Sequence, residues 1–437
     1  MKPAKISTSS AEARITAAMI DHAGEALGRL LDFSQPADTL LSAYFREQRM
    51  LGGRERGFIA ETCYAVLRRK RQLEKLVAPA KSARWLVVAS LLRFSGVGQR
   101  QLAEVVSAAE KDWLREFKSR REPEFSLADQ ADLPDWLVEW LLMGCSATEL
   151  LALARGLNQA APLDLRVNSI KARRDEILVR LAADGIAAQA CRHAPLGIRL
   201  NGKPALQKHP LYLEGAIEVQ DEGSQLLGYL LAPKRGEMVV DFCAGSGGKT
   251  LLLGALMRST GRLYAFDVSA KRLAKLKPRV ARSGLSNIHP ICIASENDIR
   301  VKRLAGKIDR VLVDAPCSGL GTLRRNPDLK WRQTPQGVAE LTQKQTDILA
   351  GAARLVKPGG RLVYATCSIL AEENDAVVDA FIAAHPDFQR LNASEVLAQQ
   401  GITVDACAHG AMGQDFHLLP HLHGTDGFYA AVLERRK

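Results

Sequence analysis

Two cysteines in the C-terminal half of the 437-residue chain stand at the ends of predicted strands, each followed by a serine. They are Cys317, in the stretch 313–319 (Val-Asp-Ala-Pro-Cys-Ser-Gly), and Cys367, in the stretch 364–368 (Tyr-Ala-Thr-Cys-Ser). A thiolate that adds to C6 of a pyrimidine makes the poorly nucleophilic C5 enamine-like, so that C5 can accept a methyl group. A second group must then help to remove the C5 proton so that the thiolate can leave. Two thiols beside a methyl-donor site would therefore suit methylation of a pyrimidine at C5.

This chemistry does not say which cysteine attacks and which assists release. Cysteines often serve only as small apolar core residues, but the carboxyl ends of strands form the edge at which open α/β sheets bind ligands. Asp314 lies just before Cys317 and could hydrogen-bond the N3–N4 edge of a cytosine. A proton held at N3 would make C6 more electrophilic. Lys249 could lower the pKa of a thiol or contact the base.

A glycine-rich turn precedes both cysteines, at 241–250 (Asp-Phe-Cys-Ala-Gly-Ser-Gly-Gly-Lys-Thr). Its end resembles a phosphate-binding loop, and 311–314 resembles the strand that accompanies such a loop, but that motif requires a glycine where this chain has Cys243. A class I methyltransferase turn fits better, because its glycines let the backbone approach the methionine part of S-adenosylmethionine. Asp267 ends the next predicted strand and would hydrogen-bond the ribose hydroxyls. Its alternative role is that of a helix cap before Ser269.

The composition indicates a basic globular protein. Hydrophobic residues make up 47% of the chain, charged residues make up 25%, and the formal net charge is +12. This charge favours a polyanionic partner, with nucleic acid ahead of a membrane surface. The stretch 1–10 is polar, unlike a signal peptide, and no apolar run is long enough to span a bilayer. The eight cysteines include no Cys-x-x-Cys pair, so we expect reduced thiols and a cytoplasmic location.

The sequence pattern predicts three domains: a helical domain at 1–150, a small mixed α/β domain at 151–225, and an α/β domain at 226–437. The apolar spacing at 54–76 is helical, with a basic end at 68–71 that either contacts RNA or is a solvated helix end. In the small domain we expect a strand at 165–171, a helix at 176–184, and short strands near 188–200 and 211–219.

The last domain alternates predicted strands and helices, which indicates a doubly wound, mostly parallel sheet of the Rossmann-like type. The strands are expected at 238–242, 262–266, 290–293, 310–313, 361–365 and 428–433. The helices are expected at 248–258, 269–283, 335–356 and 372–384.

Three stretches closely resemble the RsmB/NOP/Sun family of RNA cytosine-C5 methyltransferases. They are 314–322 (Asp-Ala-Pro-Cys-Ser-Gly-Leu-Gly-Thr), 324–331 (Arg-Arg-Asn-Pro-Asp-Leu-Lys-Trp) and 366–374 (Thr-Cys-Ser-Ile-Leu-Ala-Glu-Glu-Asn). The resemblance implies that Cys367 is the nucleophile and that Cys317 assists release. The stretches 165–168, 219–225 and 419–429 fit the family too, so the resemblance is strong from about residue 160 to the C-terminus. It is weaker before that, where 54–67 looks like the NusB-like helical domain of bacterial members.

The resemblance also implies a set of contacts to S-adenosylmethionine. The family's turn is usually Cys-Ala-Ala-Pro-Gly-Gly-Lys-Thr, whereas Gly245-Ser246 stands here in place of Ala-Pro. After the third strand the family has Gly-Asp-Ala-Arg or similar, where this chain offers Asp298 by motif and Glu296 by spacing. The expected cofactor-binding residues are Cys243, Ala244, Gly245, Ser246, Gly247, Gly248, Lys249, Asp267, Asp298 and Asp314. Cys367, Cys317, Asp314 and Lys249 are the expected catalytic residues.

Two further groups of residues were candidates for binding. The histidines of the C-terminal stretch lack a supporting carboxylate pattern, so we expect no metal site. A basic loop with an aromatic residue after Cys317 suits contact with RNA backbone and bases, although it could also be merely exposed. The histidines are His417, His421 and His423, and the loop residues are Arg324, Arg325, Lys330 and Trp331.

Together these features predict an S-adenosylmethionine-dependent enzyme that methylates C5 of a cytosine in RNA through a covalent adduct. The target base would have to be flipped out of its stack to reach the thiols. Bacterial relatives with a NusB-like domain favour 16S ribosomal RNA, with transfer RNA as an alternative. A non-catalytic RNA-binding or ribosome assembly factor is a second alternative, and a protein or small-molecule methyltransferase is disfavoured because nitrogen and oxygen acceptors need no thiol adduct. We expect a monomer that binds RNA, without a membrane or metal partner.

Overall fold

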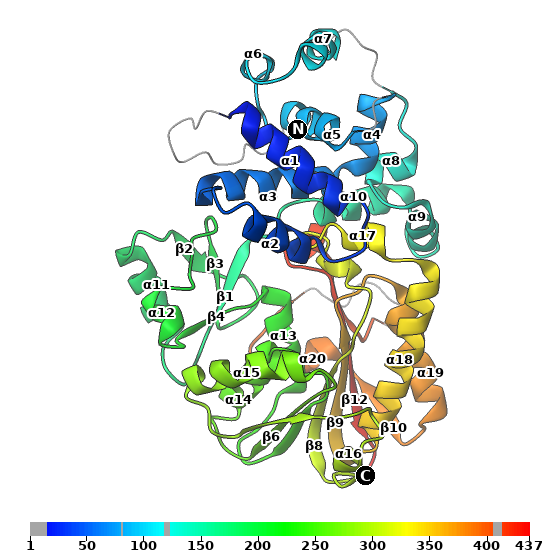
Figure 1. Cartoon of the computed structure of the whole chain (residues 1–437). Coiled ribbons are helices and arrows are strands. Elements are labelled where there is room, and N and C mark those ends of the chain that lie inside the picture. Colours follow the sequence, from blue (N-terminus) through cyan, green and yellow to red (C-terminus); the bar gives the residue numbers. More distant parts are fainter. Residues whose placement is uncertain (1–14, 80–81, 118–122, 405–412) are drawn as a thin grey trace. The chain divides into compact units, whose positions relative to one another are not determined.

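The structure is a computed structural model that describes residues 15–79, 82–117, 123–404 and 413–437 (Figure 1). Tertiary contacts divide the chain into two units. One comprises residues 1–159 together with 323–334, and the other comprises residues 160–322 together with 335–437. The polar stretch 1–10 lies outside the described residues. Within the described ranges, no helix is both long enough and apolar enough to cross a membrane.

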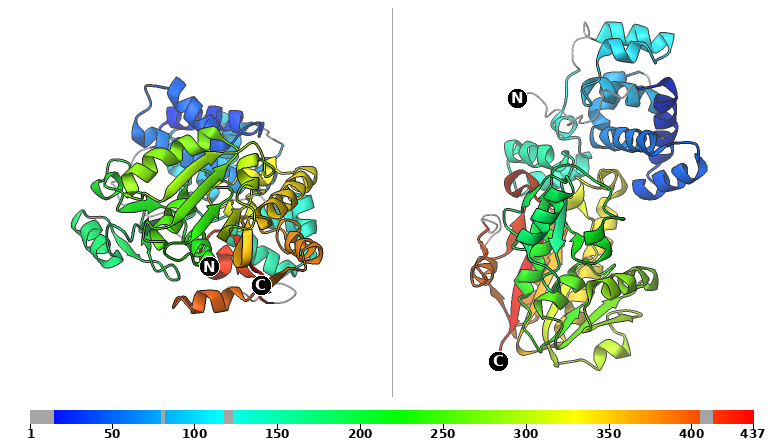
Figure 2. Two further views of the ribbon diagram at one scale, coloured as in Figure 1. Left: turned by 90° about the horizontal axis from the view of Figure 1, so that it is seen from below. Right: turned by 90° about the vertical axis from the view of Figure 1, so that its left-hand side faces the viewer.

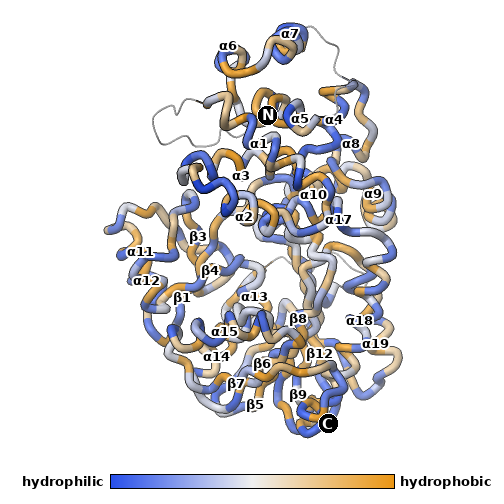
Figure 3. Tube along the Cα trace, viewed as in Figure 1, coloured by the Kyte–Doolittle hydropathy of each residue, from blue (hydrophilic) through white to orange (hydrophobic). Residues whose placement is uncertain are grey.

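The described residues of the first unit form helices without strands, as the sequence predicts. Along α3 (Gly53–Arg68), the buried residues Ile59, Cys63, Val66 and Leu67 recur at helical spacing, and hydrophobic and hydrophilic residues also alternate along the other helices (Figure 3). The predicted helical stretch 54–76 is interrupted at residue 69, after which α4 (Lys70–Val77) begins. The other helices are α1 (Ala17–Leu30), α2 (Ala37–Glu47), α5 (Ala83–Arg93), α6 (Gln99–Ala103), α7 (Ala108–Phe117), α8 (Leu127–Ala131), α9 (Asp135–Leu142), α10 (Ala147–Leu157) and α17 (Leu329–Arg332).

The segment 323–334, which contains α17, belongs to this helical unit although it follows Cys317 in sequence. Lys330 is fully buried and donates hydrogen bonds to the carbonyl oxygen of Arg68 and to Oδ1 of Asn158, at 2.9 and 2.8 Å. The Trp331 indole donates to the carbonyl oxygen of Leu67 at 2.8 Å. These donors satisfy carbonyl groups at the C-terminal end of α3, which would otherwise lack partners. The expectation that Lys330 contacts RNA is therefore wrong, because its ammonium group is enclosed by the helical unit.

A four-stranded antiparallel sheet opens the second unit, with strand order β2-β3-β1-β4. Its elements are β1 (Leu163–Val167), α11 (Arg174–Ala183), β2 (Ala188–Ala190), β3 (Gly197–Leu200), α12 (Pro210–Leu213) and β4 (Ile217–Val219). The prediction of a strand throughout 211–219 is wrong in its first half. The His209 side chain accepts a hydrogen bond from the backbone N–H of Leu211, and Pro210 stands at the first helical position, so a short helix forms there.

The larger sheet has eight strands and confirms the predicted Rossmann-like class. Its order is β10-β12-β9-β8-β5-β6-β7, with β11 paired to β12. The neighbours from β9 to β7 are parallel, whereas β10, β11 and β12 join as antiparallel strands. The strands are β5 (Met238–Asp241), β6 (Arg262–Asp267), β7 (Ile288–Cys292), β8 (Ile308–Asp314), β9 (Val356–Thr366), β10 (Phe388–Leu391), β11 (Phe416–Leu418) and β12 (Phe428–Arg435).

Both faces of this sheet are covered by helices, which explains why its strands are nearly continuous apolar runs. Successive residues enter different cores, since Leu312 lies in one and its neighbours Val311 and Val313 lie in the other. Figures 1 and 2 show the sheet between the two helix layers. The first layer contains α13 (Glu222–Leu231), α14 (Gly248–Leu256), α15 (Ala270–Ser283) and α20 (Ala393–Ala398), and the second contains α18 (Pro335–Ala353) and α19 (Asp375–Ala384). Two further short helices are α16 (Ile299–Lys302) and α21 (Pro420–His423).

Candidate active site

The glycine-rich turn lies between the end of β5 and the start of α14, at the carboxyl edge of the parallel strands. Gly247 has a φ of 89°, and a Cβ there would lie 2.1 Å from the Leu276 side chain, so only glycine fits. Gly245 also has a positive φ, 56°, but the space around it is open. The backbone therefore leaves a bare turn at a helix N-terminus, which suits close approach by a ligand.

Asp267 ends β6, the strand next to β5, and closes one side of the turn. Its carboxylate accepts hydrogen bonds from the backbone N–H groups of Gly245 and Ser269, at 2.8 and 2.7 Å. The Arg272 guanidinium lies 3.1 Å from the same carboxylate but is half exposed. Ser269 is the N-cap of α15, and Asp267 holds the backbone of that residue as well as the turn. Its contact with ribose hydroxyls stays a prediction.

Two arginines that sequence reasoning did not assign brace the turn from outside. Arg166, on β1, donates to the carbonyl oxygen of Gly248 at 2.6 Å and also hydrogen-bonds the Gln220 side chain. Arg279, on α15, donates to the carbonyl oxygen of Ser246 at 2.7 Å. The sequence predicts a strand at 165–171 and a family match at 165–168, but no local pattern indicates that Arg166 reaches a turn 82 residues away.

Lys249 and Asp314 form an ion pair at the centre of this edge. Lys249 stands in the first turn of α14, Asp314 ends β8, and Nζ lies 2.7 Å from Oδ2. Burial opposes the charge on Lys249, but the charge and hydrogen bond of Asp314 outweigh it and raise the lysine's pKa. Lys249 is therefore a permanent cation that orients the Asp314 carboxylate.

The two predicted thiols meet beside this ion pair. Parallel pairing sets Asp314 opposite Ala365, so the segments that follow β8 and β9 leave the sheet side by side, and the Sγ atoms of Cys317 and Cys367 lie 3.4 Å apart. Gly321 donates its N–H to the Cys367 carbonyl oxygen at 2.8 Å. A Cβ at Gly321 would lie 2.7 Å from that same oxygen, so the close contact requires glycine.

The surroundings of the thiols make them unequal. The pKa of Cys317 is raised well above its usual range by the hydrogen bond to Cys367, by burial, and by the negative charges of Cys367 and Glu373. The raised pKa keeps Cys317 protonated, so its S–H is available to donate to the Cys367 sulfur. Because the thiolate is the nucleophilic form of cysteine, this arrangement favours Cys367 as the attacking group.

Alkylation should report this inequality in the protein without RNA. With limiting iodoacetamide at pH 7.5, we expect Cys367 to be carboxamidomethylated at least about tenfold faster than Cys317, as measured by peptide mass spectrometry. Since a raised pKa keeps Cys317 protonated, its labelling should rise only well above pH 9 in the wild type. Cys63 serves as an internal control, because burial raises its pKa to about 12. Preferential labelling of Cys317 at pH 7.5 would contradict the assignment.

Asp298 lies in the segment after β7, but its carboxylate serves the local backbone. It caps α16 through the N–H of Arg300 at 2.8 Å, accepts the N–H of Ala294 at 2.9 Å, and pairs with the Arg300 guanidinium at 2.6 Å. These donors lower its pKa. Glu296 accepts a hydrogen bond from the neighbouring Asn297 amide. The contact of Asp298 with the adenine side of the cofactor therefore stays a prediction, with Glu296 as the alternative.

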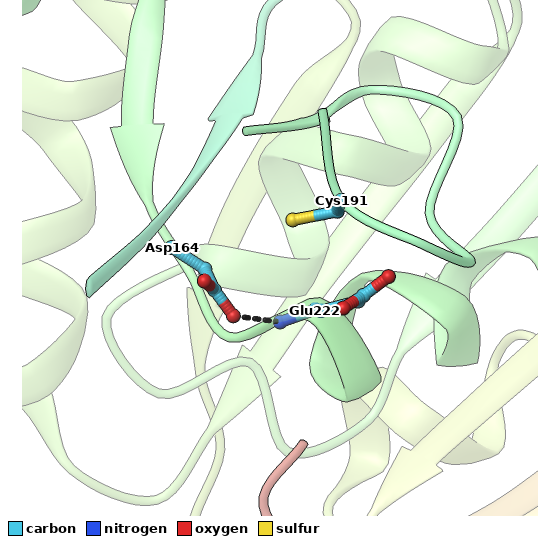
Figure 4. Close-up of side chains that lie close together, drawn as sticks. All are labelled: Asp164, Cys191 and Glu222. Atoms are coloured by element: carbon cyan, nitrogen blue, oxygen red, sulfur yellow. Dashed lines mark hydrogen bonds between the residues drawn. The ribbon is translucent and has the colours of Figure 1, made fainter. Parts of the chain in front are cut away.

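One buried group outside this edge has the residue types of a metal site, namely Asp164, Cys191 and Glu222 (Figure 4). It is the only such group among the residues that the structure describes. Arg199 already neutralises it, with nitrogens 2.8 and 2.9 Å from the two Asp164 oxygens and 3.3 Å from Glu222. Burial raises the pKa of the Cys191 thiol, which keeps it protonated and a poor ligand. The group is best explained as an ion-pair cluster joining the small sheet to α13.

The edge of the sheet fits S-adenosylmethionine by its donor set. The glycine turn offers bare backbone, Asp267 offers a carboxylate for ribose hydroxyls, and Asp314 lies on the opposite side of β5. Asp241, fully buried at the end of β5, has an Oδ1 without a hydrogen-bond partner among the described residues. These groups match a cationic methyl donor that carries a ribose.

Comparison with known proteins agrees with this geometry. Residues 228–434 match the family described as 16S rRNA methyltransferase RsmB/F, and residues 133–207 match the ferredoxin-like domain of RsmF/B-like methyltransferases. The chain is 35% identical to the probable ribosomal RNA small subunit methyltransferase B of Synechocystis sp., over 87% of this chain and 91% of that protein. It is 31% identical to the protein of the same description from Bacillus subtilis, over 95% and 98% of the two chains.

A solved structure gives the same result for the fold. The methyltransferase homologue protein from Pyrococcus horikoshii is 26% identical, covers 72% of this chain and 100% of its own, and superposes with a TM-score of 0.62. The resemblance noted from the sequence is thereby confirmed over nearly the whole chain. The chain belongs to the family of the ribosomal RNA small subunit methyltransferase B proteins.

Proposed function

We propose that this protein methylates C5 of a cytosine in 16S ribosomal RNA through a covalent bond between Cys367 and C6. S-adenosylmethionine supplies the methyl group. The observation that carries the proposal is the pair of sulfurs 3.4 Å apart beside the Lys249–Asp314 ion pair. A nitrogen or oxygen acceptor would use neither thiol.

The reaction begins when the Cys367 thiolate adds to C6 of the flipped cytosine. As the added electron pair enters the ring, N3 takes up a proton from solvent, and the Asp314 carboxylate, oriented by Lys249, stabilises the resulting N3–H. C5 then becomes nucleophilic and takes the methyl group. Because Cys367 is by then bonded to carbon, Cys317 loses both the hydrogen bond and the neighbouring charge that raise its pKa. It can release its proton to solvent, accept the C5 proton, and so allow the C6–S bond to break.

The predicted residues around the glycine turn belong to the proposal as cofactor contacts. Residues 243–249 would approach the methionine part of the cofactor, and Asp267 would bind the ribose. The proposed domain limits remain 1–150, 151–225 and 226–437, with the segment 323–334 as part of the helical unit. We also propose that the protein acts in the cytoplasm as a monomer, and that its basic helical unit binds the RNA.

Removing the ribose contact should weaken cofactor binding. We expect Asp267→Asn to raise the Kd for S-adenosylhomocysteine by roughly tenfold to a hundredfold, since a hydrogen bond to a charged group contributes about 1.5–3 kcal/mol. Isothermal titration calorimetry measures the change. Asp347→Asn, an exposed acid on α18, is the control and should leave the Kd within twofold. An unchanged Kd in Asp267→Asn would remove Asp267 from the site.

Methylation of purified RNAs tests the substrate assignment. Unmodified 16S ribosomal RNA, 23S ribosomal RNA and transfer RNA would be incubated with the protein and methyl-labelled S-adenosylmethionine, and the products digested to nucleosides. We expect labelled 5-methylcytidine from 16S ribosomal RNA alone. Label in transfer RNA would support the alternative substrate, and tight RNA binding without any methyl transfer would support a non-catalytic assembly factor.

A further inference from the structure

Glu373 lies beneath the two thiols and is not among the residues that the sequence singled out. It belongs to the short 3-10 helix Ala371–Glu373, between the Cys367 segment and α19, and is fully buried. Among the residues that the structure describes, no lysine, arginine or histidine forms an ion pair with it. A buried acid without a cation is costly unless hydrogen bonds compensate for its lost hydration, so its partners identify its role.

Four donors surround the Glu373 carboxyl group, and three of them come from the serines that follow the catalytic cysteines. Oε1 accepts the backbone N–H of Ser318 at 2.7 Å and the Gln345 amide at 3.0 Å. Oε2 accepts the hydroxyl groups of Ser318 and Ser368, each at 2.5 Å. An acceptor-only pattern of this kind suits an ionised carboxylate. Both serines are almost fully buried, so these bonds are not exchanged with water.

This single carboxylate therefore ties the Cys317 segment to the Cys367 segment. The two hydroxyl oxygens also lie 3.2 Å from each other, so Glu373, Ser318 and Ser368 form a compact group one residue away from the sulfurs. Strands β8 and β9 bring the two segments to the same edge, but a strand end leaves a following turn free to rotate. The carboxylate removes that freedom, and its charge also acts on Cys317.

We propose that Glu373 is the positioning residue of the catalytic pair: by holding Ser318 and Ser368 on one carboxylate, it sets the separation and orientation of the Cys317 and Cys367 thiols. The inference rests on the proposed function, in which both thiols must reach one cytosine ring. Small misplacements of reacting groups slow a reaction strongly. Glu373 acts through the serines and does not touch the substrate.

The geometry can be measured without RNA by the rate at which the two thiols form a disulfide. Diamide takes two electrons and two protons from the thiols, is itself reduced to the hydrazine, and leaves an S–S bond between Cys317 and Cys367. We expect Glu373→Gln to slow this closure at least about tenfold, because an amide in place of the carboxylate cannot accept all four hydrogen bonds. The linked peptide is quantified by mass spectrometry. Glu372→Gln, the neighbouring position in the same short helix, should close within twofold of the wild type.

Turnover provides the second readout. Glu373→Gln should lower kcat for RNA methylation about tenfold to a hundredfold while KM for RNA and the Kd for S-adenosylhomocysteine stay within about twofold. Combining it with Ser318→Ala and Ser368→Ala should cause little further loss, since all three changes remove one network. If Glu373→Gln does not fold, disulfide closure and kcat can be measured in Ser318→Ala and in Ser368→Ala, each of which removes one hydroxyl that donates to Glu373.

Wild-type closure and wild-type kcat in Glu373→Gln would overturn the proposal. A parallel loss of cofactor affinity and kcat would also overturn it, because the residue would then support the fold as a whole. If disulfide closure is slower in Glu373→Gln than in the wild type, the positioning role of Glu373 holds even if no RNA is methylated. Failure of the proposed function can therefore be distinguished from failure of this inference.

Discussion

Cys317→Ala is expected to accumulate as a covalent protein–RNA complex, whereas Cys367→Ala should form no such complex. Attack at C6 needs only Cys367, but release needs a base for the C5 proton, so without Cys317 the reaction stops after methyl transfer. A denaturing gel of each variant incubated with 16S ribosomal RNA and S-adenosylmethionine would show a retarded band for Cys317→Ala alone. Both variants should lose turnover by a factor of about 10³ or more.

Several controls make this gel decisive. The double variant Cys317→Ala with Cys367→Ala should give no retarded band. Cys292→Ala, which changes the last residue of β7, should behave as the wild type. Omitting S-adenosylmethionine tests whether the trapped species has already received its methyl group. A retarded band for Cys367→Ala alone would exchange the two roles and would contradict the proton assignment drawn from the pKa of Cys317.

Asp314→Asn is expected to reduce kcat by about 10²–10⁴, the range attributed to loss of a positioned acid or base. The neutral amide cannot stabilise a protonated N3 as the carboxylate does, and it leaves the Lys249 ammonium without its counter-charge at 2.7 Å. Adduct formation itself should fail. Introduced into Cys317→Ala, the change should therefore abolish the retarded band, which separates activation of C6 from the later release step.

Asp309→Asn is the matched control, since Asp309 lies at the opposite end of the same strand, β8. Its carboxylate accepts the N–H of Met238 at 2.8 Å and pairs with Lys357, and these partners lower its pKa. That variant should lose some stability but keep kcat within about threefold. If Asp314→Asn retained wild-type turnover, or Asp309→Asn lost as much of it, the role given to Asp314 would be wrong.

The sequence predicted the α/β unit well because its signals are local. Repeated apolar runs separated by helical stretches define β5 to β9, and a parallel sheet necessarily gathers their carboxyl ends. The glycine turn, Asp267, Asp314 and the two cysteines could be named for the same reason: each ends or follows a strand that the sequence pattern locates. The strands β10 and β11 were not predicted, because runs of four and three residues carry too little periodicity.

The features that the sequence did not reveal depend on partners far away in the chain. The sequence pattern around Lys330 is that of an exposed basic loop. Its ammonium group, however, donates to Arg68 at the end of α3, 262 residues away, and to Asn158, 172 residues away. Arg166 reaches the glycine turn from another sheet. In the sequence, Glu373 is one of two adjacent acids at the start of a predicted helix. Its role becomes visible only in the structure, where it accepts hydrogen bonds from the serines that follow both cysteines.

The central claim, that the acceptor is C5 and that it loses its hydrogen, is tested most directly by tritium release. 16S ribosomal RNA made with [5-³H]cytidine would be incubated with the protein and [¹⁴C]methyl-labelled S-adenosylmethionine. After correction for the specific activity of the cytidine, we expect one tritium atom to be released into water for each labelled methyl group incorporated into the RNA. Methyl incorporation without release of tritium would place the methyl group on another atom and would contradict the account.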